Sequence, residues 1–153
     1  MEIQLKEVEG ILVSLHKIFN SNQVNSGLKF NQILKWAKEI KNLELIFGTF
    51  SKMRDSLIAK YGMPIDGKAN SYRVPPENIP EFNREINTII TEKVEITNEK
   101  ISLNSILSAW ESNKSINPID IKNLMIFINP EELTDENLEK MEKIEKKVKE
   151  KKK

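Results

Sequence analysis

One long stripe of apolar residues constrains this chain more than any other feature. Apolar side chains recur every three or four residues from Phe30 to Tyr61, which is the repeat of an α-helix. A helix over residues 28–61 would be roughly 50 Å long at ~1.5 Å per residue. Gly48, near its middle, marks a position where such a helix can bend. The stripe comprises Phe30, Ile33, Ala37, Ile40, Leu43, Phe47, Phe50, Leu57 and Tyr61.

The sequence also predicts where this helix ends. Gly62 follows the last stripe residue, and glycine takes the left-handed backbone of a helix end without steric cost. Pro64 then prevents the helix from resuming. The pair Asp66-Gly67 predicts a turn at the head of a loose hairpin, whose return arm is Tyr72–Val74. The pair Pro75-Pro76 ends that arm.

Shorter patterns flank the long helix. Ile3 and Leu5 alternate with polar residues as in an edge strand, and a helix follows over about residues 6–20. After the hairpin, Asn78 suits an N-cap and Pro80 lies in the first turn of a third helix. The apolar face of that helix is formed by Phe82, Ile86, Ile89, Ile90 and the stem of Lys93. Strand-like alternation follows at Val94, Ile96, Ile101 and Leu103.

The strands after the third helix would pair with residues 3–5 or with residues 72–74. Residues 103–110 suit a short helix. The sequence from Asn117 to Asp120 has an N-cap, a proline at the first helical position and an acidic third residue, which together predict a helix start. That helix ends at Asn129-Pro130, and the last helix begins at 134–137.

These patterns predict a mainly α fold with a small antiparallel β-sheet and a long central helix. We expect one α+β domain over residues 1–130, followed by a charged C-terminal helix and tail over residues 131–153. A length of 153 residues suits one domain. The chain has no cysteine, which excludes disulfides, thiolate metal sites and a cysteine nucleophile.

Charge and hydropathy narrow the functional classes. The formal net charge is +1, so no global field draws the chain to nucleic acid or to an anionic membrane. No apolar run approaches the roughly 20 residues of a membrane span. The polar segment Met1–Glu7 does not suit a signal peptide.

Residues 62–69 come closest to a catalytic motif. They match the glycine and lysine spacing of a phosphate-binding loop, but Ala69 replaces the hydroxyl residue that holds Mg²⁺. A phosphate-binding loop also follows a strand and opens a helix, whereas a helix precedes this one. A helix stop followed by an Asp66-Gly67 turn explains the string better than a nucleotide site does.

Other candidates for chemistry also have plainer explanations. His16 is the only histidine, and no partner for catalysis or metal binding can be named from sequence. Glu77, Glu81, Glu85 and Glu92 follow helical spacing, which a solvated helix face explains better than a cation site. We therefore predict no catalytic residue, no metal site, no cofactor and no enzymatic activity.

Two regions are candidates for binding a partner protein. The first is the hairpin-like loop over residues 63–76, represented by Ile65, Asp66, Lys68, Tyr72 and Arg73. The second is a narrow apolar stripe on the last helix, formed by Leu138, Met141, Ile144 and Val148. Such a stripe docks either on its own domain or on another chain.

The lysine-rich end over Lys146–Lys153 is the best candidate for nucleic-acid contact. Glutamates are interleaved with these lysines, and lysines are expected at a helix C-terminus because of the helix dipole. No aromatic residue is interleaved to stack on bases. A solubilising helix end is therefore favoured over a nucleic-acid arm.

The order of motifs resembles a family of small proteins of tailed phages and prophages of low-GC Gram-positive bacteria, a family without assigned function. The resemblance covers roughly residues 1–130 and implies a phage gene product made in the cytoplasm of the infected bacterium. It implies no activity and no functional residues. The segments that carry it are Lys60–Gly62, Asp66–Lys68, Tyr72–Val74, Glu81–Ile86, Val94–Ile96 and Lys100–Leu103.

Three functions of different classes remain open. The first is a non-enzymatic interaction protein that binds a host protein or inhibits an anti-phage defence protein. The second is a morphogenesis or virion component that self-associates through its last helix. The third is a nucleic-acid accessory protein that uses the lysine tail.

Overall fold

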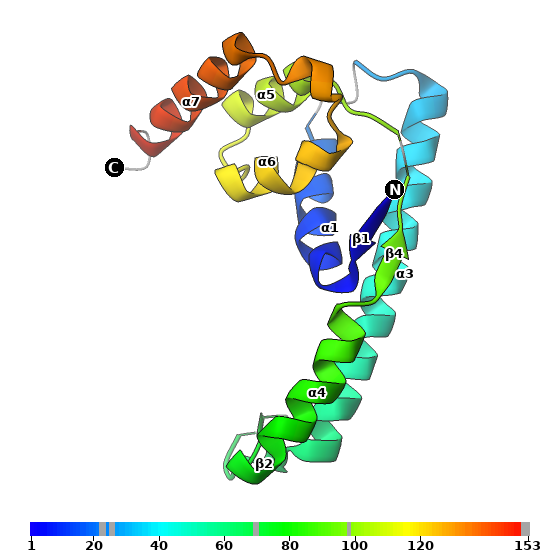
Figure 1. Cartoon of the computed structure of the whole chain (residues 1–153). Coiled ribbons are helices and arrows are strands. Elements are labelled where there is room, and N and C mark those ends of the chain that lie inside the picture. Colours follow the sequence, from blue (N-terminus) through cyan, green and yellow to red (C-terminus); the bar gives the residue numbers. More distant parts are fainter. Residues whose placement is uncertain (22–23, 25–26, 69–70, 98, 151–153) are drawn as a thin grey trace. The chain divides into compact units, whose positions relative to one another are not determined.

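Figure 1 shows the computed structural model of the chain, which describes residues 1–21, 24, 27–68, 71–97 and 99–150. Helices dominate these residues, and the described strands form two small antiparallel sheets. The predicted fold class, mainly α with a small antiparallel sheet and a long helix, is therefore confirmed. No helix in this part of the chain is both long and apolar enough to cross a membrane.

The chain divides into two compact units. Unit 1 comprises Met1–Val8 and Asn42–Ile96, and unit 2 comprises Glu9–Lys41 and Thr97–Lys153. Of the three boundaries, two fall inside helices, α1 (Leu5–Phe19) and α3 (Phe30–Tyr61), and the third follows Ile96. The helix α3 continues without interruption across Gly48, the position at which the sequence allowed a bend.

Unit 1 contains both sheets. β1 (Glu2–Gln4) pairs antiparallel with β4 (Lys93–Glu95), and β2 (Met63–Pro64) pairs antiparallel with β3 (Tyr72–Arg73). Of the two pairings that the sequence left open for the strand near Val94, the one with the first strand is present, and so is the predicted hairpin. Gly67 heads the hairpin with φ of 76°, a conformation that favours glycine.

The end of α3 is joined to α4 (Ile79–Ile90) by side-chain contacts. The ring centroids of Tyr61 and Phe82 lie 6.3 Å apart in an edge-on arrangement. Tyr61 Oη donates to Glu85 Oε1 at 2.6 Å, and Lys60 Nζ donates to the same oxygen at 2.7 Å. None of the α4 residues is fully buried, so this pair of helices encloses a thin core.

Three local expectations in unit 1 are wrong in detail. Gly62 ends α3 without a positive φ; it is needed because an added Cβ would lie 2.4 Å from the carbonyl oxygen of Ile58. Asn78 does not cap α4 with its side chain, because a 3₁₀ turn over Pro76–Asn78 precedes the helix and Asn78 Nδ2 donates to the Tyr61 carbonyl instead. Lys93 lies in β4 and not on the helix face.

Unit 2 contains most of the aromatic core. Trp36 of α3 is 1% exposed and packs between Phe19, at 5.4 Å between ring centroids, and Phe127, at 5.0 Å. Unit 2 also contains α5 (Leu103–Ser112), α6 (Pro118–Leu124) and α7 (Asp135–Glu150), with 3₁₀ turns at Met125–Phe127 and Pro130–Glu132.

The predicted strand at Ile101 and Leu103 is wrong. Leu103 is the first residue of α5, and its N–H donates to Glu132 Oε2 at 2.8 Å. Ile101 is buried, and its N–H donates to the carbonyl of Phe127. Alternating burial therefore arises here from a helix entry, because the bonds that these residues make are not those of a strand ladder.

Candidate protein-binding site

The site begins with the way α6 is held. Asn117 caps this helix by accepting hydrogen bonds from the N–H groups of Ile119 and Asp120, and Asp120 accepts one from the N–H of Asn117. The predicted capping box is therefore present. Asp120 is 3% exposed and also accepts from Lys17 Nζ at 2.8 Å, which ties α6 to α1. This tie positions Ile121 and Met125.

The last helix packs against its own unit. α7 lies along α5 (Figure 1), and Ile144 is 6% exposed. Leu138 and Met141 lie on another side of α7, and Val148 is half-buried. The stripe predicted from sequence thus divides: Ile144 anchors α7, whereas Leu138 keeps 41% of its surface exposed.

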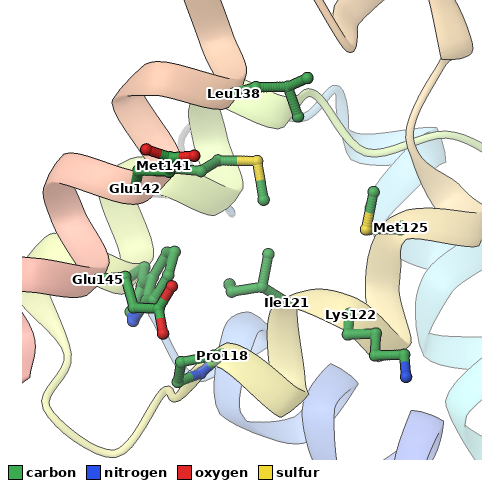
Figure 2. Close-up of a pocket in the computed structure, with 9 residues that line it drawn as sticks. Pro118, Ile121, Lys122, Met125, Leu138, Met141, Glu142 and Glu145 are labelled. Atoms are coloured by element: carbon green, nitrogen blue, oxygen red, sulfur yellow. The ribbon is translucent and has the colours of Figure 1, made fainter.

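Leu138 and Met141 line a pocket formed by α5, α6 and α7, which we call the α5–α6–α7 pocket. Its volume is about 330 Å³, at the lower end of the range for ligand sites. Figure 2 shows Leu138 and Met141 of α7 facing Ile121 and Met125 across an open space. The full lining comprises Trp110, Pro118, Ile121, Lys122, Met125, Leu138, Met141, Glu142 and Glu145.

The pocket combines an apolar interior with a few polar groups. Glu142 and Glu145 lie on the α7 side and Lys122 on the α6 side (Figure 2). Trp110 is 3% exposed, and its Nε1–H has no hydrogen-bond partner among the described residues. A buried donor without an acceptor costs on the order of 1–3 kcal/mol of stability.

Acidic and basic side chains of α7 line different hollows, a separation that the sequence analysis did not predict. Glu142 and Glu145 line the α5–α6–α7 pocket, whereas Lys140, Lys143 and Lys147 line a different hollow of about 350 Å³ against α5. Because residues three and four apart share a helix face, interleaved acidic and basic residues can occupy opposite flanks. Of the lysines in the predicted nucleic-acid end, Lys147 belongs to this basic flank. Lys151–Lys153 lie outside the described residues.

The second predicted region lies in unit 1. Ile65, Asp66, Lys68, Tyr72 and Arg73 are all exposed. Ile65 and Arg73 line a shallow hollow of about 420 Å³ beside the hairpin, and the other three do not.

Sequence reasoning missed a fourth hollow, which lies where α3 meets β4. It has a volume of about 290 Å³ and includes Phe50, Leu45 at 64% exposure and Met53 at 42% exposure. Helical spacing placed Phe50 on the apolar stripe and Met53 on its flank, and it did not single out Leu45. Exposure of large apolar side chains on such a stripe depends on how many neighbours cover it, which periodicity does not report.

The candidate catalytic residues of the sequence lie on exposed helix faces and in a turn. His16 is exposed on α1, and residues 62–68 form the end of a helix, a short strand and a turn. Glu81 pairs with Arg84, and Glu85 with Lys60 and Tyr61. Within the described ranges, no group of three or more potential metal ligands is found.

Comparison with protein-family models, with curated proteins and with solved structures found no match to this chain.

Proposed function

We propose that this chain is a phage-encoded, non-enzymatic interaction protein that binds a host protein or an anti-phage defence protein. The observation that carries the proposal is the α5–α6–α7 pocket, an apolar site into which Leu138 and Met141 still expose surface. The resemblance to tailed-phage proteins suggests the origin and the bacterial cytoplasm as the place of action.

The composition of the pocket suits a protein partner. Met125 and Met141 lie on facing sides, and methionine adapts to irregular apolar surfaces because its side chain is unbranched and polarizable. A pocket of about 330 Å³ accommodates one large apolar side chain. Tryptophan in a desolvated pocket is also typical of binding hot spots, and Trp110 provides it.

The charges indicate which kind of segment would bind. Glu142 and Glu145 place two carboxylates beside the apolar opening, against a single cation from Lys122. Complementary charges favour a basic segment. The proposed partner is therefore a basic amphipathic helix that inserts a leucine, methionine or phenylalanine, as in helix-in-groove recognition.

The test is capture of a binding protein from host lysate, using the full chain and two matched variants. Leu138→Asp places a charge at the pocket opening and should abolish capture. Ile119→Asp places the same charge on α6 at a position that is 68% exposed and does not line the pocket, so capture should persist. The captured protein is identified, and a peptide from its basic helix is titrated while the fluorescence of the two tryptophans, Trp36 and Trp110, is followed.

Equal capture by both aspartate variants would contradict the proposed site. A captured protein whose contact segment is acidic, or binding that depends only on Lys140, Lys143 and Lys147, would contradict the proposed partner chemistry. Binding of DNA or RNA with steep salt dependence through those lysines would favour the nucleic-acid alternative instead.

A further inference from the structure

The sheet formed by β1 and β4 has one edge with free backbone groups. Ile3 pairs with Val94, and further bonds run from the N–H of Leu5 to the carbonyl of Glu92 and from the N–H of Ile96 to the carbonyl of Met1. Because alternate residues of an antiparallel strand bond to the same neighbour, the N–H and C=O groups of Lys93 and Glu95 point away from β1.

The two edges of this sheet differ. On the β1 edge, the outward N–H of Gln4 donates to Glu7 Oε2 at 2.8 Å, so the first turn of α1 closes that edge. On the β4 edge, no residue in the described part of the chain bonds to the outward N–H groups of Lys93 and Glu95. An edge strand in this state is a template for another strand.

The charges on the exposed face of β4 are also incompletely paired. Glu2 and Glu95 are direct cross-strand partners with like charge, which is unfavourable. Lys93 Nζ contacts Glu2 Oε2 at 2.8 Å, whereas Glu95 has no ion pair with any described residue. The strand Lys93-Val94-Glu95 therefore lacks a cation opposite its second charged residue.

We propose that two copies of this chain associate through β4, with the two strands antiparallel about a two-fold axis at Val94. In that register Lys93 lies opposite Glu95 of the second copy, and Glu95 lies opposite Lys93 of the second copy. Each outward N–H and C=O group of these residues gains a partner. The result is a four-stranded sheet in the order β1, β4, β4, β1, with an isologous interface.

The opposite face of the same strand supports this arrangement. Val94 lines the hollow that also contains Phe50, Leu45 and Met53. A second β4 strand would place its Val94 beside the first, because residues at the two-fold axis of an antiparallel pair lie directly opposite. This valine would cover part of the apolar surface that the exposed Leu45 and Met53 leave open. A two-stranded sheet is marginal alone, and four strands over an apolar face are more stable.

Sedimentation equilibrium of the full chain tests this dimer. The wild-type chain should dimerise, and Lys93→Glu or Glu95→Lys alone should raise the dimer Kd by about tenfold, because each places like charges opposite each other twice. The double swap of Lys93→Glu with Glu95→Lys should restore the dimer to within about threefold of the wild-type Kd, since opposite charges again face each other.

A backbone variant provides a test that does not depend on charge. Glu95→Pro removes an outward N–H but no bond to β1, so the monomer should fold with an unchanged circular dichroism spectrum and should not dimerise. A wild-type chain that stays monomeric up to about 1 mM would overturn the proposal. A dimer or larger assembly that persists in Glu95→Pro would overturn the proposal too. So would a double swap of Lys93→Glu with Glu95→Lys that does not restore the dimer. Ile119→Asp and Leu138→Asp should leave dimerisation unchanged.

Discussion

Lys17 Nζ lies 2.8 Å from Asp120 Oδ2, although the two residues are 103 positions apart. The carboxylate is nearly buried, whereas the lysine side chain keeps 27% of its surface exposed. Asp120 also accepts hydrogen bonds from Ser14 Oγ and from the N–H of Asn117. The Asp120 side chain thus completes a helix cap and joins α6 to α1, and Lys17 neutralises its buried charge.

Replacing Asp120 should destabilise unit 2. Asp120→Ala removes the capping box, worth ~1 kcal/mol, and leaves Lys17 without its acceptor, whereas Ser14 keeps its hydrogen bond to the Gly10 carbonyl. We expect a loss of about 3 kcal/mol in the free energy of unfolding, in line with the breaking of buried ion pairs. Urea unfolding followed by circular dichroism measures it.

Lys17→Met keeps the helix cap but leaves Asp120 as a buried charge without a cation. This variant should therefore also lower the free energy of unfolding. Lys38→Met, at an exposed position of α3, is the control and should change stability by less than about 0.5 kcal/mol. Equal effects of Lys17→Met and Lys38→Met would mean that the Lys17–Asp120 pair contributes nothing.

Two glycines of the long helix region should respond to alanine in opposite directions. An added Cβ at Gly48 meets nothing within 4 Å, so Gly48→Ala should stabilise by about 1 kcal/mol through helix propensity. At Gly62 the Cβ would lie 2.4 Å from the Ile58 carbonyl oxygen and 3.1 Å from Tyr72 Cβ, so Gly62→Ala should destabilise. Thermal unfolding of both variants measures the two effects, and a Gly62→Ala variant as stable as the wild type would contradict the steric role of Gly62.

The aromatic cluster should dominate the stability of unit 2. Phe127 is fully buried, with its ring 5.0 Å from that of Trp36. Phe127→Ala should cost on the order of 3–5 kcal/mol because it removes buried area and leaves a cavity. Phe30→Ala, at a position that is 74% exposed, should change stability by less than about 0.5 kcal/mol. Guanidinium unfolding of both variants compares them.

The contact of Lys60 and Tyr61 with Glu85 should give unit 1 a pH dependence. Hydrogen bonds from Lys60 and Tyr61 lower the pKa of Glu85, and the bond to Glu85 raises the pKa of Lys60. The contribution of Glu85 is therefore present above its usual pKa of 4.5 and is lost as the pH falls through its lowered value. The contribution of Lys60 is present below its usual pKa of 10.5 and is lost as the pH rises through its raised value.

Glu85→Gln tests this dependence. The variant should be less stable than the wild type at neutral pH, and the difference should shrink in acid, where Glu85 of the wild type is protonated. Thermal unfolding across the pH range measures it, with Glu77→Gln as the control because Glu77 is exposed and has no ion pair with a described residue. A difference that stays constant down to low pH would show that charge is not the cause.

The proposed binding site was only partly predictable. Helical spacing placed Leu138, Met141, Ile144 and Val148 on one stripe, but it could not distinguish the residue that anchors α7 from those that remain accessible. Ile144 is buried and Leu138 is exposed because α5 covers one side of α7 and not the other. Met125 and Trp110, which complete the pocket, come from other segments and have no sequence relation to the stripe.

The sequence by itself determined the features that depend on neighbouring residues. These are the long helix, its end at Tyr61, the turn at Asp66-Gly67, the capping box from Asn117 to Asp120 and the mainly α fold class. Such features follow from side-chain periodicity, backbone preference and local hydrogen bonds, which act over about four residues. Tertiary structure alone decided the entry of Leu103 into a helix, the Lys17–Asp120 pair, the open edge of β4 and the two charged flanks of α7. Each depends on which distant segment supplies a partner or a cover, and periodicity carries no information on that choice.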